Sequence, residues 1–418
     1  MSLATKPIAN NKPKHELIAD LQSRGVRLVS AEQEHVSRRG GAGPSDHQVM
    51  VVGGTPVMVP VYTQPVMQSP FSLDQDKENP LRSSLLSDGI PVADITFAAE
   101  PNFYRGTTAD GIPYSKIATL HSTDVLATTI LQTCIRYESR KNTCKFCSIG
   151  QSLNAGRTIA HKTPEQLAEV AKAAVELDGV KHMVMTTGTP PTPDRGAKVL
   201  YESVVGVKAA VDIPIQVQCE PPNDFGWFQK LKDAGADALG MHLEVVTPEL
   251  RKQIMPAKAK VTVDEYMDAF RAAVPVFGWG QVSTYILAGL GDTAEAILDI
   301  CDQLLAVGVY PFVVPFVPIR GTPLEDHPPP SPEFMESILR PLGQKTVAAN
   351  MRAESIKAGC GRCGACSSLN VFEEQALEDS ISMSENLEKE ALENSRSMSN
   401  DLEETGLEDS TFEKSHFQ

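Results

Sequence analysis

Short apolar runs alternate with amphipathic helical segments from Asp124 to about residue 317. Apolar runs of this length, separated by helices, are typical of parallel βα units. Six such units are too few for a closed eight-stranded barrel, so the predicted fold class is α/β, a partial (β/α)6 barrel. The expected strands are 125–133, 181–187, 213–219, 237–245, 281–288 and 309–317, and the expected helices are 164–178, 196–210, 225–234, 262–274 and 293–307.

Alternation along two of these strands indicates which face carries the chemistry. In the stretches IPIQVQCE and DALGMHLEV, apolar side chains alternate with polar residues or glycine. Successive side chains point to opposite faces of a strand, so we expect the apolar set to face the helices and the polar set to face the barrel interior, near the carboxyl strand ends. The inward set is Gln216, Gln218 and Glu220 on one strand and Gly240, His242 and Glu244 on the next, whereas Cys219 faces the helices.

The first 120 residues are predicted to be an α+β extension. A helix is expected at His15–Arg24 and two strands within Gln48–Tyr62, the second of them at a sheet edge because it contains two prolines. Residues 69–90 are expected to be a surface linker. The stretch RRGGAGPSDH, residues 38–47, sets flexible backbone beside two arginines and is either a substrate-contacting loop or a structural one.

The candidate chemistry centres on three cysteines that follow the first predicted barrel strand. Cys134, Cys144 and Cys147 form a C-x9-C-x2-C pattern. Three clustered thiols predict a metal centre that leaves one coordination position open for a small molecule. Phe146 lies between the last two cysteines, where an apolar side chain would shield a cluster from water.

A second group of cysteines follows a helix expected at 333–357. Cys360, Cys363 and Cys366 form a C-x2-C-x2-C pattern, which is typical of ferredoxin-type iron–sulfur ligands, and no histidine lies nearby in the sequence. We favour an auxiliary iron–sulfur cluster over the alternative, a structural zinc with an unidentified fourth ligand.

The net charge of −15 belongs mostly to one end of the chain. Residues 373–418 contain 14 acidic and 3 basic residues, so the preceding 372 residues carry only −4. No basic stripe indicates a nucleic-acid partner, and no run reaches the ~18 apolar residues of a membrane-spanning helix. The N-terminal sequence lacks the apolar segment of a signal peptide, so a cytoplasmic protein is expected, and the acidic tail, poor in aromatic residues, is predicted to be disordered.

Together these features resemble the radical SAM superfamily, in particular its biotin-synthase-like branch. The cysteine loop after the first strand, the Gly-rich fifth strand STYILAGLGD and the closing stretch PFVVPFVPIRGTPLE carry the resemblance. The motifs RRGGAGPSDH, LQTCIRY, TTGTP, QCEPP, GMHLE, VSTYILAGLGD and KAGCGRCGACSSL are similar in combination to a radical SAM family encoded in nitrilase-containing gene clusters, over residues 15–372.

The resemblance implies a [4Fe-4S] cluster and S-adenosylmethionine (SAM) as cofactors. Cys134, Cys144 and Cys147 would hold the cluster, and SAM bound at its open iron would yield a 5′-deoxyadenosyl radical that takes a hydrogen atom from a small-molecule substrate. Reduced flavodoxin or ferredoxin is the implied electron donor. The implied binding residues are Phe146 beside the cluster, Thr186, Thr187 and Gly188 at the methionine end, Glu244 at the ribose, and Ile286, Gly289 and Gly291 at the adenine, with His242 and Glu220 as candidate catalytic residues.

Two features depart from the family pattern. The usual cysteine spacing is C-x3-C-x2-C, whereas the first interval here is nine residues. Gly188 stands where the motif after the second strand usually has a glutamate, and Glu220 is a candidate replacement for that carboxylate.

The expected division is an N-terminal extension (1–120), the radical SAM barrel (121–327), a helix with the second cysteine group (328–372) and the acidic tail (373–418). Two other classes fit the cysteines alone. One is a non-catalytic iron–sulfur electron carrier or zinc-stabilised scaffold, and the other is a hydrolase with zinc at the first three cysteines. The polar barrel interior favours a radical SAM enzyme, because a carrier needs no substrate cavity.

Overall fold

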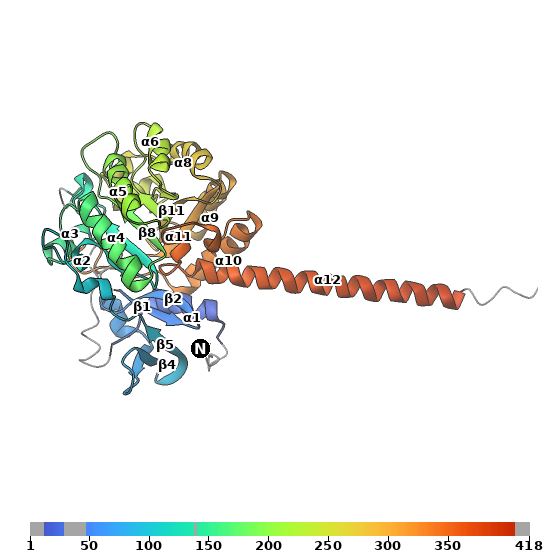
Figure 1. Cartoon of the computed structure of the whole chain (residues 1–418). Helices are drawn as coiled ribbons and strands as arrows, with labels where there is room; N and C mark the ends of the chain where they lie inside the picture. Colours follow the sequence, from blue (N-terminus) through green and yellow to red (C-terminus); the bar gives the residue numbers. More distant parts are fainter. Residues whose placement is uncertain (1–11, 29–46, 138, 140, 406–418) are drawn as a thin grey trace, which may run out of the picture.

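The computed structural model describes residues 12–28, 47–137, 139 and 141–405, with side chains as far as residue 390. Within these residues the chain forms two sheets, one of seven strands and one of five (Figure 1). Of the predicted loop RRGGAGPSDH, residues 38–46 lie outside the described part of the chain.

The seven-stranded sheet confirms the predicted partial barrel. Its strands are β6 (Thr119–His121), β7 (Val125–Thr129), β8 (His182–Thr186), β9 (Ile215–Gln218), β10 (Ala238–Gly240), β11 (Val282–Ala288) and β12 (Val309–Pro315). Strands β7 to β12 are parallel neighbours in chain order, and β6 adds an antiparallel edge to β7. Strands β7 to β12 all lie inside their predicted ranges, because short apolar-rich runs separated by helices mark the strands of a parallel sheet, whereas β6 was not predicted.

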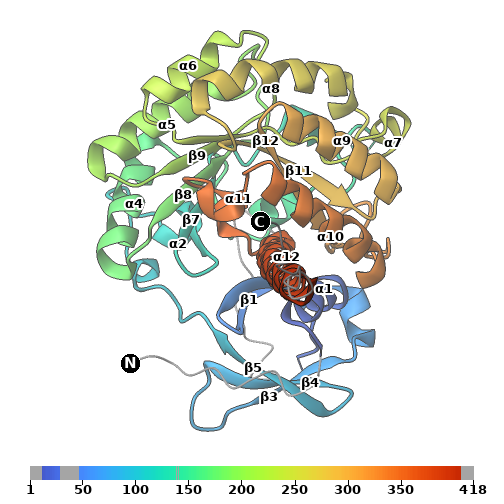
Figure 2. The same ribbon diagram turned by 90° about the vertical axis from the view of Figure 1, so that its right-hand side faces the viewer.

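Helices cover the outer side of the curled sheet, as Figure 2 shows. They are α4 (Pro164–Asp178), α5 (Ala197–Ala210), α6 (Gly226–Asp233), α8 (Val263–Phe277) and α9 (Ala294–Ala306). Threonine caps begin three of them: the side chain of Thr163 accepts from the backbone N–H of Gln166 in a capping box, and Thr262 and Thr293 cap α8 and α9. Shorter elements in the connections are α3 (Ile149–Asn154), α7 (Pro248–Ile254), η4 (Ile135–Tyr137) and η5 (Lys258–Lys260).

The N-terminal part forms a separate antiparallel sheet with the order β2-β1-β5-β4-β3. The expected helix is α1 (Lys14–Arg24), and the expected hairpin is β1 (His47–Val52) with β2 (Thr55–Pro60), which lies at the sheet edge as its prolines predict. The linker prediction for residues 69–90 is wrong, since this segment contains two strands. The further elements before the barrel are η2 (Gln64–Gln68), β3 (Phe71–Gln75), β4 (Arg82–Ser87), β5 (Ile90–Phe97), η3 (Asn102–Arg105) and α2 (Tyr114–Ile117).

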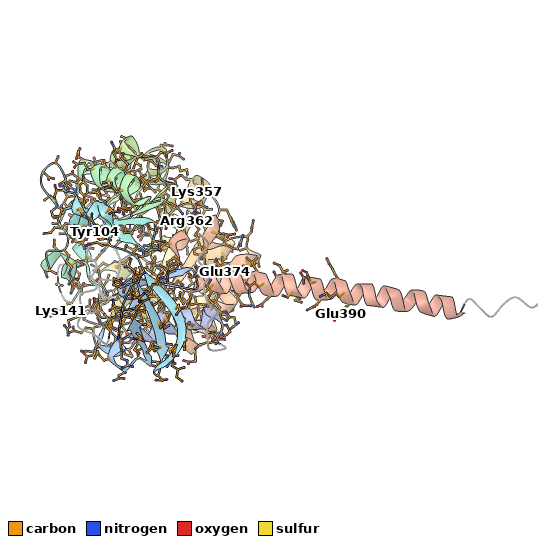
Figure 3. All side chains as sticks on the ribbon, turned by 60° about the horizontal axis from the view of Figure 1, so that its bottom comes forward. Tyr104, Lys141, Lys357, Arg362, Glu374 and Glu390 are labelled. Carbon is orange, nitrogen blue, oxygen red and sulfur yellow. The ribbon has the colours of Figure 1, made fainter. Side chains whose placement is uncertain are left out.

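The C-terminal part returns to the barrel and then leaves it. Helix α10 (Pro332–Ala348) ends earlier than expected, and η6 (Ala353–Ser355) and α11 (Cys360–Cys363) follow. Helix α12 (Leu369–Thr405) buries Leu369 and Phe372 against the body and then projects from it, so that in Figure 3 Glu374 lies at the body and Glu390 far along the helix. The backbone is thus helical where the composition predicts disorder, because Leu, Glu and Ala are strong helix formers.

No helix in the described residues combines the length and the apolar character that crossing a membrane requires.

Candidate active site

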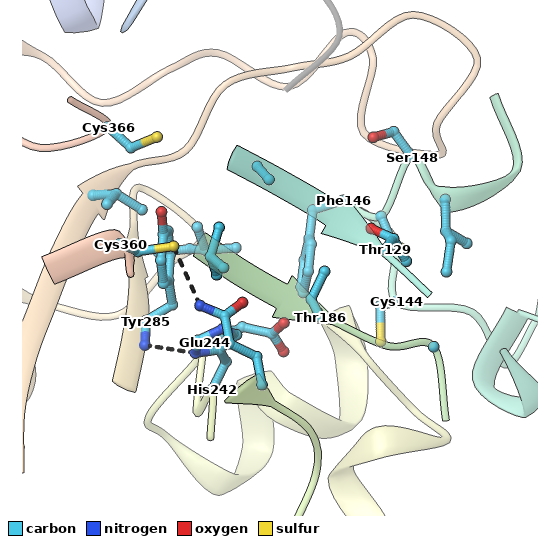
Figure 4. Close-up of a pocket in the computed structure, with 18 of the residues that line it drawn as sticks. Thr129, Cys144, Phe146, Ser148, Thr186, His242, Glu244, Tyr285, Cys360 and Cys366 are labelled. Carbon is cyan, nitrogen blue, oxygen red and sulfur yellow. Dashed lines mark hydrogen bonds between the residues drawn. The ribbon is translucent and has the colours of Figure 1, made fainter. Parts of the chain in front are cut away.

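Both cysteine groups border one cavity of about 410 Å³ inside the barrel. This is within the usual range for ligand cavities. Figure 4 shows Cys144 on one side of it and Cys360 and Cys366 on the other, with Glu244, His242 and Tyr285 nearby. None of these six described cysteines forms a disulfide, so each can act as a ligand.

The first group is held by the loop that leaves β7. The sulfur of Cys134 accepts hydrogen bonds from the backbone N–H of Arg136 at 3.4 Å and of Thr189 at 3.3 Å. The turn to the other two cysteines is closed by the Cys147 N–H, which donates to the Cys144 carbonyl at 3.0 Å. Hydrogen bonds from the backbone to cysteine sulfurs are among the features that tune an iron–sulfur cluster.

Apolar surroundings affect the other two thiols. Burial raises the pKa of Cys144 well above its ordinary value and that of Cys147 to about 12, and nearby anionic groups add to the rise. Without a bound cation these thiols are therefore protonated at neutral pH, and a thiolate requires the compensating charge of a metal centre. Phe146 packs in the same apolar cluster as Cys144 and Cys147, as expected for a residue that shields such a centre.

The donor set fits an iron–sulfur cluster. Three free thiols border one cavity, an apolar wall surrounds two of them, and N–H groups point at the third. Among the described residues, no group of three or more His, Cys, Asp or Glu side chains is arranged to hold a single metal ion.

The TTG turn lies beside this loop. Thr186, Thr187 and Gly188 border the cavity, and the Gly188 N–H donates to the Leu131 carbonyl at 2.9 Å. A Cβ atom at Gly188 would lie 2.1 Å from the Thr133 carbonyl oxygen. A glutamate cannot replace Gly188 without moving the backbone that leads to Cys134.

Glu244 borders the cavity in a strained backbone conformation, with φ of 65°. The Lys258 ammonium donates to its carboxylate at 2.7 Å. Burial lowers the pKa of Lys258, but the charge of Glu244, together with Tyr266, Glu220 and Cys144, outweighs burial and holds that pKa above its ordinary value. The carboxylate therefore enters the cavity already paired with a cation.

Glu220 is paired in the same way. Arg136 donates to its two oxygens at 3.2 and 2.9 Å, and the Thr189 hydroxyl donates at 2.9 Å. Burial raises the pKa of the Glu220 carboxyl, but these hydrogen bonds and nearby positive charges outweigh it, so the pKa is lowered. A carboxylate held in this state is a fixed anion, poorly suited to accepting a proton.

His242 lies deep in the cavity and is neutral. Burial, with a smaller contribution from Lys258, lowers its pKa to about 3. Its Nδ1 accepts a hydrogen bond from the Tyr285 backbone N–H at 3.2 Å, so the ring proton is on Nε2. His242 is thereby fixed as a neutral hydrogen-bond donor.

The predicted adenine residues are not brought to the cavity. Ile286 is fully buried in the core, Gly289 packs against Pro330, and Gly291 packs against Leu250. The neighbours of Ile286 on β11, Tyr285 and Leu287, border the cavity instead.

The loop of the second cysteine group reaches into the barrel. Gln218 donates from Nε2 to the Cys360 sulfur at 3.2 Å. No histidine is near these cysteines in the sequence, but the fold brings one to them: His121 Nδ1 is 3.5 Å from the Cys363 sulfur and Nε2 is 3.7 Å from the Cys366 sulfur. By contrast, Cys219 packs in the core as predicted, although the residue also borders the cavity.

Four residues of the site are not among those predicted from the sequence. Arg136 stands two residues after Cys134, and Tyr285 has the inward parity of β11, so both had a local signal. Lys258 and His121 had none, because their partners Glu244 and Cys363 are distant in sequence and meet them only in the fold.

Comparison with known proteins is consistent with this site. Residues 141–304 match the family model described as the Radical SAM superfamily. The chain therefore contains a radical SAM domain, and the predicted enzyme class with its [4Fe-4S] cluster and SAM is confirmed. The matched region contains Cys144 and Cys147 and begins after Cys134.

Individual relatives are distant. A bacteriochlorophyllide c C-7(1)-hydroxylase of Chlorobaculum limnaeum is 23% identical over 352 residues, which cover 80% of this chain and 84% of that protein. A lipoyl synthase of Bacillus subtilis is 26% identical over 170 residues, and the match spans 40% of this chain and 53% of that protein. Among solved structures, methylornithine synthase gives a TM-score of 0.42 at 20% identity, covering 60% of this chain and 69% of that one.

Proposed function

We propose that the chain cleaves SAM reductively and takes a hydrogen atom from a small molecule bound in the barrel. Cys134, Cys144 and Cys147 hold the [4Fe-4S] cluster, which together with SAM supplies the 5′-deoxyadenosyl radical. The observation that carries the proposal is that these three free thiols border one cavity together with the polar side chains of Gln218, His242 and Glu244. The motif resemblance to the family of nitrilase-containing gene clusters supports the same activity.

The residues around the first cysteines suit SAM. The backbone at Thr186 to Gly188 borders the cavity beside Cys134, where its carbonyl groups accept from an ammonium group. The Glu244 carboxylate accepts from ribose hydroxyls on the side that Lys258 leaves free. Leu287 offers an apolar surface near Glu244, with Tyr285 beyond it, in place of the adenine contacts expected from Gly289.

The substrate would lie further inside the barrel. Arg136 and Lys258, the two cations among the described residues that border the cavity, are each paired with a carboxylate, so neither of them is left to bind an anionic substrate. His242 offers an N–H donor, and Gln218 offers an amide. This arrangement favours a small polar substrate without net negative charge.

A second iron–sulfur cluster at Cys360, Cys363 and Cys366 would face the same space. We expect the enzyme to act in the cytoplasm, where reduced flavodoxin or ferredoxin supplies the electron.

Pulsed electron–nuclear double resonance on the reduced, reconstituted protein tests the SAM site. SAM labelled with ¹⁵N and ¹⁷O in its methionine part should show couplings to the cluster, and Cys144→Ala should abolish them. Cys301→Ala is the matched control, since this fully buried thiol of α9 lies away from the cavity. A cluster-loaded protein without these couplings would contradict the proposal.

A further inference from the structure

The loop of the second cysteine group closes the amino-terminal end of the barrel. The Gly359 N–H donates to Nδ1 of His182, the first residue of β8, at 3.1 Å. The Cys360 N–H donates to Oε1 of Gln216 on β9 at 3.1 Å. Gly359 has φ of 94°, and a Cβ there would lie 2.0 Å from the same oxygen, so this close approach requires glycine.

His121 reaches the same loop from the edge strand of the sheet. It is the last residue of β6, and its side chain is buried at 6% relative exposure. Ser122, which follows it, is also buried and has a positive φ of 60°, an unusual conformation for serine. The strained turn after β6 therefore fixes the position of the imidazole against the cysteine loop.

One imidazole ring contacts two of the three thiols. Its Nδ1 lies 3.5 Å from the Cys363 sulfur and its Nε2 lies 3.7 Å from the Cys366 sulfur. Imidazole nitrogen and thiolate sulfur are the two protein donors that iron–sulfur clusters use most. These residues are more than 240 positions apart in the chain, so the fold itself assembles a mixed Cys/His set.

We propose that His121 is the fourth protein ligand, beside Cys360, Cys363 and Cys366, of an iron–sulfur cluster at the amino-terminal end of the barrel. The proposal rests on the second cluster of the proposed function and names its complete ligand set. His121 could also be the fourth ligand that the zinc alternative lacked, so the number of protein ligands does not distinguish the two metals. The surroundings of the site have to distinguish them.

The surroundings favour iron and sulfide over zinc. All four side chains border the cavity, but no three or more His, Cys, Asp or Glu side chains among the described residues are arranged to hold a single metal ion, as a zinc site requires. The Cys360 sulfur accepts from Gln218, and hydrogen bonds between the Tyr285 hydroxyl and the thiols of Cys360 and Cys366 are part of the same arrangement. Hydrogen bonds to the sulfurs adjust the potential of an iron–sulfur cluster, and a histidine ligand raises it relative to an all-cysteine set.

The test uses the full chain with Cys134, Cys144 and Cys147 all replaced by alanine, so that only the second site remains. The protein is labelled with ¹⁵N-histidine and reconstituted anaerobically with iron and sulfide. Iron and acid-labile sulfide are counted, and electron spin echo envelope modulation of the reduced protein measures nitrogen coupled to the cluster. We expect a sulfide-containing cluster with one strongly coupled histidine nitrogen.

Three substitutions make the assignment specific. His121→Ala should abolish the nitrogen coupling, and His121→Cys should keep the cluster, lose the coupling and lower the reduction potential. His161→Ala is the control, because this histidine is exposed, and it should leave the spectrum unchanged. If the triple alanine variant does not fold, the same difference between His121→Ala and the unsubstituted chain is measured with both clusters present.

Coupling that persists in His121→Ala, or is absent before substitution, would overturn the proposal. So would zinc in place of iron and sulfide. Failure of SAM cleavage is a separate outcome, because the variant without the first three cysteines reports only on the second site.

Discussion

Replacing Arg136 with methionine removes the cation that neutralises Glu220 inside the barrel. The two groups share two hydrogen bonds, of 3.2 and 2.9 Å, and their side chains are only 15% and 6% exposed. Arg136 also donates from Nη1 to the Ala257 carbonyl at 3.0 Å. The residue therefore ties the long loop between Cys134 and Cys144 to the end of β9 and to the segment beyond α7.

Leaving a buried charge without its partner costs about 3–5 kcal/mol, so Arg136→Met should lower the free energy of unfolding by about that amount at pH 7. The pH dependence should also change sign. In the unsubstituted protein the pKa of Glu220 is lowered, so its contribution to stability is present above the unfolded pKa and is lost as the pH falls through the folded value. In Arg136→Met burial dominates and raises this pKa, so part of the lost stability should return as the pH falls from 7 to 5.

Urea unfolding of the metal-free protein at pH 7 and pH 5 measures both effects. The double variant Arg136→Met/Glu220→Gln is the control, because it removes the charge as well as its partner and should recover most of the loss. An Arg136→Met protein within about 1 kcal/mol of the unsubstituted chain at pH 7, or a double variant no more stable than the single one, would refute the reasoning.

Three further predictions follow from single contacts. Gly188→Ala should destabilise the chain by about 1–3 kcal/mol and lower the iron content of the first site, because its Cβ would lie 2.1 Å from the Thr133 carbonyl oxygen. An unchanged free energy of unfolding and an unchanged iron content would contradict this. Cys219→Ala should retain the iron of both sites, and loss of either cluster would contradict its placement in the core. Lys162→Met should stabilise the chain by about 3 kcal/mol at pH 7, because burial lowers the pKa of this lysine to about 7. The gain should shrink as the pH rises towards 10. Unfolding measured at several pH values tests both expectations.

Much of the barrel is predictable because its signals are local. The strands β7 to β12 are short apolar-rich runs separated by helices, and threonine caps mark where α4, α8 and α9 begin. The alternation along β9 and β10 also placed Gln218, Glu220, His242 and Glu244 on the inner side, and all four border the cavity.

Part of the small N-terminal sheet and part of the site could not be predicted from local sequence patterns. Residues 69–90 resemble a linker because β3 and β4 contain many serines and charged residues, yet they pair within the small sheet. On β11 the same alternation favours Tyr285 and Leu287, not Ile286, as the residues that face the interior. No local pattern connects His121 to Cys363, because an antiparallel edge strand brings them together only in the folded chain.

Release of 5′-deoxyadenosine tests the central claim most directly. The full chain, reconstituted with iron and sulfide, reduced and given SAM, should release it in a reaction that requires the reductant and is lost in Cys144→Ala. An iron-loaded chain that releases no more 5′-deoxyadenosine than Cys144→Ala would contradict the account.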